Sequence, residues 1–281
     1  MRTFLNTKHF FTLDDALTIS MKFSPSTVLL KGLLPLLLIG LWWALTRWGS
    51  IPPILLPSLE AVAKTFWTLL RSGKLIHDIE ASAFRALVGF SLSAVMAISL
   101  AFLLTRYRAL QRFLSIPLEA LRVIPPLALI PLLILWLGIN EAPKIAIVIL
   151  ASFFPIFLST RTALANVDPK LIEVGHVLGF STKEIQQRIV LPSALPGLLT
   201  GLRLGFGYSW RALVGAELIA ASSGLGYLIN DSADFGQTSV VFVGIITIAV
   251  LGILADALLA GVIKRLTTHW SQARSVNGGL F

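Results

Sequence analysis

The chain has 281 residues, of which 56% are hydrophobic and only 13% are charged. Soluble domains carry about 25% charged residues, so the composition excludes an ordinary soluble protein and indicates an all-α, polytopic membrane protein. The formal net charge of +9 indicates a membrane orientation and not a nucleic-acid partner, because basic residues gather on the cytoplasmic side of membrane proteins. The absence of cysteine excludes disulfides, thiol catalysis and Cys-ligated metals.

Residues 1–27 are polar and non-periodic, and we predict that they form an N-terminal cytoplasmic tail. No small-residue cleavage pattern follows the first apolar run, so we expect no cleaved signal peptide. Met21 stands just before that run and is therefore an alternative to Met1 as the native start.

Residues 28–80 are predicted to hold the first membrane span and an external helix. The span runs from about Val28 to Trp48, since roughly 20 apolar residues cross a bilayer, and tryptophans gather at its far end, where indole rings prefer the interface. Prolines 52, 53 and 57 then forbid continued helix. Ser58 caps an amphipathic helix that runs to about Arg71 and is expected to lie along the outer face.

Residues 81–265 are predicted to form the transmembrane core, with five more spans at about 81–105, 113–138, 143–163, 194–221 and 239–263. Residues 266–281 would be a C-terminal cytoplasmic tail. Six spans place both termini in the cytoplasm. Basic residues after the second and sixth spans agree with the positive-inside rule, whereas Lys64, Arg71 and Lys74 run against it.

The third span is expected to be a broken helix. It contains Pro117, Pro125, Pro126 and Pro131, which remove backbone donors from the helix. The acceptors left free must be satisfied within protein or a water-lined cavity. We therefore expect this span to be buried and not to face lipid.

A polar segment, residues 168–192, separates the fourth and fifth spans and carries two helix-start signals. Asp168 followed by Pro169 predicts a first helix, which Gly179 ends. Ser181 and Glu184 form a capping box that starts a second short helix. Pro192 is expected to stop that helix at about Leu191.

The spacing within this segment is Glu173, five residues, Gly179, nine residues, Ile189, and then Leu191-Pro192. It resembles the cytoplasmic EAA loop of ABC importer permeases, although Val174 and Gly175 stand where the family usually has two alanines. The resemblance implies that loop 164–192 docks onto a separate ATPase. The coupling residues it implies are Glu173, Gly175, Gly179, Ile189, Leu191 and Pro192. The alternatives are an amphipathic pair lying on the bilayer and a DNA-binding helix-turn-helix, which the flanking spans disfavour.

Three further segments, residues 56–75, 124–145 and 220–231, are similar to permeases that import sulfonates, taurine, nitrate or bicarbonate. This resemblance implies the type I ABC importer (MetI-like) fold and a homodimer in the bacterial inner membrane. It also implies two copies of an ABC ATPase and a periplasmic solute-binding protein that delivers a small anionic solute. ATP and Mg would be bound by the ATPase, and no cofactor by this chain. Consistently, the sequence has no Walker A pattern and no His-Glu-x-x-His motif.

Several charged residues lie inside the predicted spans, where ionisable groups are expensive and usually functional. Arg203 and Asp256 lie at similar depth, and we predict a buried structural ion pair between them. Glu119 and Arg122 are three residues apart on one helix face and can pair with each other.

Arg211 has no acidic residue three or four positions away on its own helix. Its guanidinium could face a wet central cavity, where its planar fork suits sulfonate or nitrate. It could instead pair with Glu217 or Glu119 across a helix contact. The predicted translocation-pathway residues are Arg211, Trp210, Glu217 and Arg122.

Gly197, Gly201 and Gly205 repeat every four residues, which predicts close helix packing within the subunit or across a dimer. Two other functions stay open. An ion-coupled secondary transporter or channel would be expected to show an internal repeat, and none is visible. An intramembrane enzyme would need a catalytic constellation, and none of the usual motifs occurs.

Overall fold

The computed structural model describes residues 25–49 and 51–275, and these form helices and short connections without a strand. The chain divides into two compact units after Leu59. The alternative start sites Met1 and Met21, and most of the predicted N-terminal tail, lie outside the described residues.

The first unit is built around α2 (Pro25–Trp48), which corresponds to the predicted first span. Its far end is fixed by the indole N–H of Trp42, which donates to the carbonyl oxygen of Pro57 at 3.0 Å. The rings of Trp43 and Trp48 pack edge to face, with centroids 5.3 Å apart. The turn after α2 is therefore held by tryptophans at the end where an interface was predicted.

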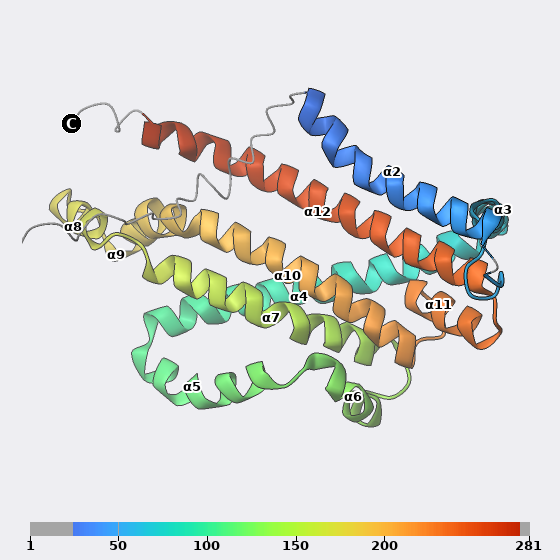
Figure 1. The fold of residues 1–281 in the computed structure, drawn as a ribbon. Coiled ribbons are helices and arrows are strands. Elements are labelled where there is room, and N and C mark those ends of the chain that lie inside the picture. The colour runs from blue at the N-terminus through green and yellow to red at the C-terminus, as the bar shows by residue number, and fades with distance from the viewer. Residues whose placement is uncertain (1–24, 50, 276–281) are drawn as a thin grey trace, which may run out of the picture. The chain divides into compact units, whose positions relative to one another are not determined.

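The second unit begins with the amphipathic helix α3 (Leu59–Arg71), which starts and ends as predicted. The helices that follow are α4 (Lys74–Arg106), α5 (Arg108–Val123), η1 (Pro126–Leu129), α6 (Ile130–Leu137), α7 (Glu141–Ala165), α8 (Pro169–Val177), α9 (Thr182–Ile185), η2 (Gln186–Val190), α10 (Leu191–Ala220), α11 (Leu225–Asp234) and α12 (Thr238–Ser275). Figure 1 shows α8 and α9 at one end of the long helices and α11 at the other. We call these the α8–α9 end and the α11 end.

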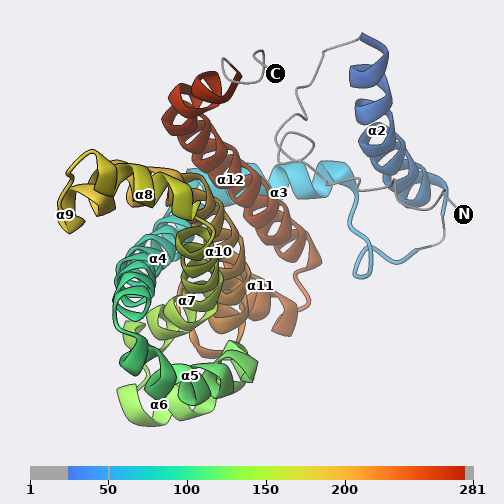
Figure 2. The same ribbon diagram turned by 90° about the vertical axis from the view of Figure 1, so that its left-hand side faces the viewer.

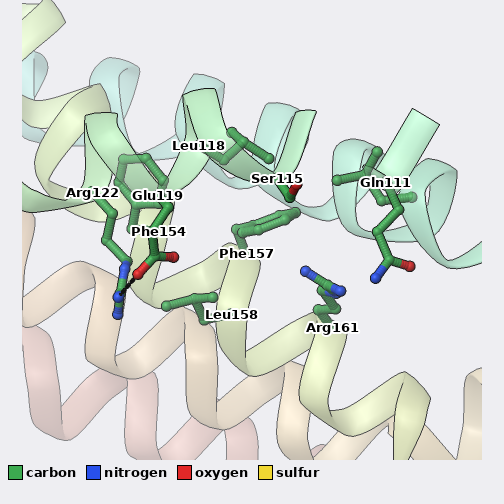
Figure 3. Close-up of a pocket in the computed structure, with 10 residues that line it drawn as sticks. Gln111, Ser115, Leu118, Glu119, Arg122, Phe154, Phe157, Leu158 and Arg161 are labelled. Atoms are coloured by element: carbon green, nitrogen blue, oxygen red, sulfur yellow. Dashed lines mark hydrogen bonds and ion pairs between the residues drawn. The ribbon is translucent and has the colours of Figure 1, made fainter. Parts of the chain in front are cut away.

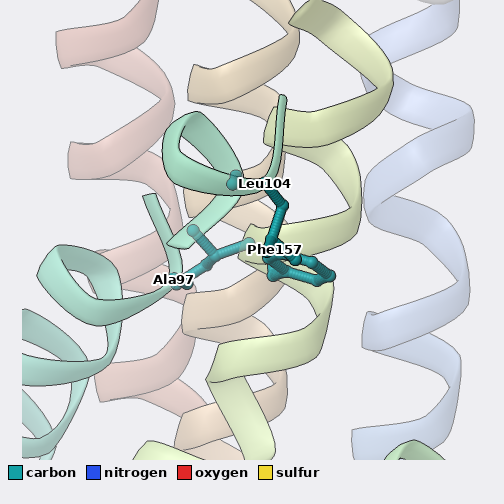
Figure 4. Packing of buried hydrophobic residues seen from close by; sticks show 5 residues of the cluster. Ala97, Leu104 and Phe157 are labelled. Atoms are coloured by element: carbon teal, nitrogen blue, oxygen red, sulfur yellow. The ribbon is translucent and has the colours of Figure 1, made fainter. Parts of the chain in front are cut away.

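Helix α7 is the centre of this unit, because it packs along both α4 and α10, as the end-on view in Figure 2 shows. In the most apolar 18-residue stretch of α7, 44% of the residues are buried, against 11% in the corresponding stretch of α12. Ala97 and Leu104 of α4 pack with Phe157 of α7 in one buried apolar cluster (Figure 4).

Close contact between α7 and α10 depends on the glycine repeat. A Cβ added at Gly201 would lie 2.5 Å from the Cβ of Ser159, and one at Gly205 would lie 2.5 Å from Cγ1 of Ile156. Of the two predicted uses of these glycines, the structure shows packing within the chain. Small residues let helix backbones approach without a clash.

Four helices of the described residues are long and apolar enough to cross a membrane, and a bent pair could supply a fifth. The four are α4, α7, the continuous helix Thr182–Ala220, and α12. Helix α2 contributes a shorter apolar stretch, Leu33–Trp48, within the described residues. The total of six spans stays a prediction.

The third span is broken, as predicted, with a bend of 91° between α5 and the η1–α6 segment. Pro125 is extended, and Pro126 opens η1, so the break falls at the proline pair. The expected burial is wrong for this chain alone, because Ile130 is the only residue of α5, η1 and α6 that is buried among the described residues. These helices lie at one side of the unit, where η1 and α6 pack mainly against α7 and α5 contacts α4.

One predicted helix end is also wrong. Pro192 does not stop the second polar helix, because the π-helical turn η2 joins α9 to α10 and Pro192 occupies the first turn of α10, where a missing donor is tolerated. Helix α12 continues to Ser275, through the first residues of the predicted C-terminal tail.

Candidate functional site

The polar helix pair at the α8–α9 end is capped as the sequence predicts. The Asp168 carboxylate accepts a hydrogen bond from the N–H of Lys170 at 2.9 Å. Gly179 has φ +77°, the left-handed conformation that glycine adopts cheaply. The hydroxyl of Ser181 accepts from the N–H of Glu184, and the Glu184 carboxylate accepts from the N–H of Ser181, which completes the capping box.

The pair is fixed to the bundle by an apolar cluster. Ile185 and Val190 pack with Leu164 at the end of α7, with Val167 and with Ala194 of α10. Ile172 of α8 packs against the same cluster, so both short helices are fixed against the ends of α7 and α10.

Gly175 lies where the two short helices touch. A Cβ on Gly175 would lie 2.7 Å from Cδ1 of Ile189 and 3.1 Å from Cγ1 of Ile185. The structure therefore brings together Gly175 and Ile189, two of the predicted coupling residues, and explains why a small residue follows Glu173 by two positions. Glu173 itself is exposed.

The outer side of α8 carries uncovered apolar side chains. The exposed fractions are 46% for Leu171, 53% for Val174, 87% for Val177 and 63% for Leu178. Their spacing of three, three and one places them along one edge of the helix. We call this the α8 edge; an apolar edge on an otherwise polar segment is typical of a protein-binding surface.

A second cluster of functional groups lies at the α11 end and was not predicted. Arg85 of α4 is 1% exposed and forms ion pairs with Glu141 of α7 and, at 2.7 Å, with Glu217 of α10. It also donates to the carbonyl oxygen of Ser223 at 2.7 Å. Lys144 shares the Glu141 carboxylate at 2.8 Å.

The same network caps the start of α11. The Glu217 carboxylate accepts from the N–H of Gly226 at 2.9 Å, the Ser82 hydroxyl accepts from the N–H of Leu225 at 2.9 Å, and Asp78 accepts from the N–H of Gly224 at 2.9 Å. These backbone N–H groups have no partner within the helix. Side chains of α4 and α10 thus hold α11 in place.

Glu217 was predicted to line a pathway, and the structure corrects this. The residue is 1% exposed and all its contacts are to the network. Arg85 is separated from Glu217 by 132 residues in sequence. The available signal was that an arginine inside an apolar run requires a partner.

The remaining predicted residues are dispersed. Arg203 and Asp256 form a two-bond ion pair at 2.9 and 2.7 Å, although both side chains are about half exposed on this chain and not buried. Arg211 donates to the carbonyl oxygen of Gly207 at 3.1 Å and lies over the ring of Tyr208, so it pairs with neither Glu217 nor Glu119. Trp210 stacks on Phe206.

Arg122 forms an ion pair with Glu119 one turn away, and both line a pocket between α5 and α7. No group of three or more His, Asp or Glu side chains that could hold a metal ion occurs in the part of the chain that the structure describes.

An all-α bundle with several apolar helices long enough to cross a membrane, and a capped polar helix pair between two of them, is the architecture of a multi-pass membrane protein. Residues 89–268 match the family described as "Binding-protein-dependent transport system inner membrane component". The chain belongs to this family and is a permease subunit of an ABC importer.

Relatives and solved structures agree. The chain is 38% identical to the putative aliphatic sulfonates transport permease protein SsuC of Bacillus subtilis (strain 168) over 86% of this chain and 87% of the relative. It is 39% identical to the protein of the same name from Escherichia coli (strain K12), over 85% and 91%. In fold it is similar to the inward-facing MetNI methionine ABC transporter, with a TM-score of 0.56, 20% identity, and coverage of 72% of this chain and 97% of that chain.

Membership has three consequences. The protein is a multi-pass membrane permease, and the family implies an inner-membrane location. The family also implies an ATPase and a substrate-binding protein as partners. The predicted resemblance to the MetI-like fold and to sulfonate permeases is confirmed.

Proposed function

We propose that this chain moves a small anionic solute, of the sulfonate, taurine or nitrate kind, into the cell, powered by a separate ATPase to which the helix pair couples. The relatives named for aliphatic sulfonates support this solute class. A periplasmic binding protein would deliver the solute at the α11 end. ATP and Mg would be bound by the ATPase.

The observation that carries the coupling role is the α8 edge. Its four apolar side chains are uncovered, while the other side of the pair is packed into the ends of α7 and α10. A partner that binds the edge can therefore push on the spanning helices without first ordering the pair. This arrangement supports docking into a groove on an ATPase, with the α8–α9 end in the cytoplasm.

The exposed third span supports a homodimer. Its prolines leave backbone acceptors that need cover from protein or water, yet Leu135, Trp136 and Ile139 are 78%, 69% and 86% exposed. A second copy would supply that cover and place the translocation path between the two subunits. Two ATPase copies would then bind two helix pairs.

In this scheme, ATP-driven closure of the ATPases draws the two helix pairs together. Each pair is continuous with α10 through η2, so the movement reaches the spanning helices directly. The bundles then rock from inward-open to outward-open, which is a rigid-body mode of switching.

Copurification tests the coupling role. Val177→Asp places a charge in the middle of the α8 edge, and we expect at least a tenfold loss of ATPase recovered with the affinity-tagged permease. Phe235→Asp is the matched control, because Phe235 is 73% exposed and Val177 is 87% exposed, but Phe235 lies at the end of α11, away from the helix pair. Full ATPase recovery with Val177→Asp would contradict the proposal.

Cross-linking tests the dimer. The chain has no cysteine, so Trp136→Cys introduces a single thiol, and mild oxidation of membranes should give a covalent dimer. Leu258→Cys on α12 is a control of similar exposure, 72% against 69%, and should remain monomeric. A monomer with Trp136→Cys and a dimer with Leu258→Cys would place the interface elsewhere.

The pathway role of Arg211 rests on its lack of an acidic partner within the described residues. Arg211→Gln should lower ATP-driven uptake of ethanesulfonate in proteoliposomes that contain the whole importer. Unchanged uptake would remove Arg211 from the pathway.

A further inference from the structure

A small pocket lies between α5 and α7, towards the α8–α9 end. Its polar lining includes Gln111, Glu119 and Arg122 of α5 and Arg161 of α7. Figure 3 shows the guanidinium of Arg161 and the amide of Gln111 extending towards the same space, beside the ring of Phe157. The pocket therefore joins polar head groups to an apolar wall.

Arg161 is the pocket's unpaired cation. Arg122 is held by Glu119, and Arg85, Lys144 and Arg203 elsewhere in the bundle also have carboxylate partners. The side chain of half-buried Arg161 has no hydrogen bond or ion pair within residues 33–49 and 51–266, whose side chains are described. With two arginines and one glutamate, the pocket carries a net charge of +1.

The amide of Gln111 adds free hydrogen-bond donors next to the Arg161 guanidinium. The side chain of Gln111 makes no hydrogen bond within the same described residues, so its amide N–H groups are available beside Arg161. The hydroxyl of Ser115 is already donated to the carbonyl oxygen of Arg112 at 2.8 Å. The donors for a ligand are thus Arg161 and Gln111, which together suit a planar or tetrahedral oxyanion.

The rest of the lining is apolar. Leu104, Leu118, Phe154 and Phe157 form the wall next to the donors. The pocket volume is about 100 Å³, and one water needs about 10–15 Å³ on the same measure. The pocket therefore has space for several waters or for one small oxyanion, with an attached alkyl chain lying along the wall.

From this geometry we propose that the pocket binds a monovalent oxyanion that carries an apolar chain, through Arg161 and Gln111. Two sources have this chemistry: a free alkanesulfonate and the phosphate headgroup of an anionic lipid. If the ligand is the alkanesulfonate, the proposal rests on the proposed import function, and the pocket would be a transient solute-binding site on the cytoplasmic half of the translocation path. The lipid source does not depend on that function.

Binding by the whole importer complex tests the proposal. Isothermal titration of ethanesulfonate into the nucleotide-free complex in phosphatidylcholine nanodiscs, without the binding protein, should show saturable binding. Arg161→Gln should weaken it at least tenfold, and Gln111→Leu should weaken it by a smaller factor. Arg112→Gln is the matched control, because Arg112 is an exposed arginine next to Gln111 in sequence but does not line the pocket; its affinity should equal that of wild type.

A lipid arm separates the two sources. In nanodiscs that contain phosphatidylglycerol, native mass spectrometry should show retained lipid on wild type and on Arg112→Gln, and its loss on Arg161→Gln, if the headgroup is the ligand. Loss of ethanesulfonate binding alone assigns the pocket to the solute. If Arg161→Gln changes neither ethanesulfonate affinity nor retained lipid, the proposal is overturned.

The outcome is separable from the import function. Stimulation of ATP hydrolysis by the loaded binding protein measures coupling through the helix pair. The pocket proposal is disproved if the wild-type complex binds neither ethanesulfonate nor phosphatidylglycerol. If the Arg161→Gln complex then keeps both the stimulated ATP hydrolysis and the ethanesulfonate uptake, the import function stands. Recovery of the ATPase subunit with Val177→Asp tests only the coupling role of the helix pair and does not depend on the pocket.

Discussion

The two ends of the second unit are held by opposite chemistry. At the α11 end, Arg85, Glu217 and Ser82 bind each other and the first N–H groups of α11 through buried, directional bonds. At the α8–α9 end, Ile185 and Val190 fix the helix pair by apolar packing. Directional bonds fail as a set when one group is removed, whereas apolar contacts adjust. The α11 end is therefore restricted to a single geometry, whereas the α8–α9 end can adjust when a partner binds.

The largest expected effect comes from removing the central cation. Arg85→Met leaves Glu217 buried without its counter-charge, which costs about 3–5 kcal/mol. We expect a large fall in the midpoint of thermal unfolding of the detergent-solubilised permease. Adding Glu217→Gln to Arg85→Met should recover part of the loss; a double variant no better than the single one would show that the charges are not coupled.

The next effect comes from a methyl group at the same end. Gly224 has φ +112°, and a Cβ there would lie 2.5 Å from Oε1 of Glu217 and 2.6 Å from Nη1 of Arg85. Gly224→Ala should cost about 2 kcal/mol or more, since a strained backbone alone costs about 1–3 kcal/mol. Gly73→Ala is the control, because Gly73 also has positive φ but no atom within 4 Å of the added Cβ, and it should lower the unfolding midpoint less.

At the α8–α9 end a smaller loss is expected from the cap. Ser181→Ala removes one half of the capping box and should cost about 1 kcal/mol. Hydrogen exchange should rise in α9 and leave α11 unchanged. Thr182→Ala, at the neighbouring exposed position, should have no such effect; exchange that rises in α11 with Ser181→Ala would show that the two ends are not independent.

The smallest effect is expected from Gly175→Ala, the same chemical change as at Gly224. Alanine favours the helix by about 1 kcal/mol, and the closest atom, Cδ1 of Ile189, is the free end of a flexible side chain. The two terms oppose each other, so stability should stay within about 0.5 kcal/mol of wild type. A loss as large as that of Gly224→Ala would remove the contrast between the ends.

The sequence predicted best what local chemistry determines. The caps at Asp168 and Ser181 and the glycine turn depend on residues a few positions apart, and each was found where expected. Four prolines predicted a broken third span, and the structure shows the break at Pro125 and Pro126, with Pro117 inside α5 and Pro131 in the first turn of α6. Pro192 was misread because a π-helical turn can deliver the chain to a first-turn proline without a break.

Long-range partners could not be predicted. Arg85 lies 56 residues from Glu141 and 132 from Glu217, and no periodicity links such positions. The same limit applies to the third span: its prolines announced the break, but burial depends on what covers the helix, and this chain alone leaves it exposed.

Because α9, η2 and α10 are continuous, one helix connects the α8–α9 end of the permease to its α11 end. The helix Thr182–Ala220 has 39 residues and is about 58 Å long at 1.5 Å per residue. A tilt of about 5° around one end displaces the other by about 5 Å at this length. Ala220 stands three residues from Glu217, so this helix ends inside the network around Arg85. A tilt that moves its α8–α9 end therefore also moves the side chains that hold α11.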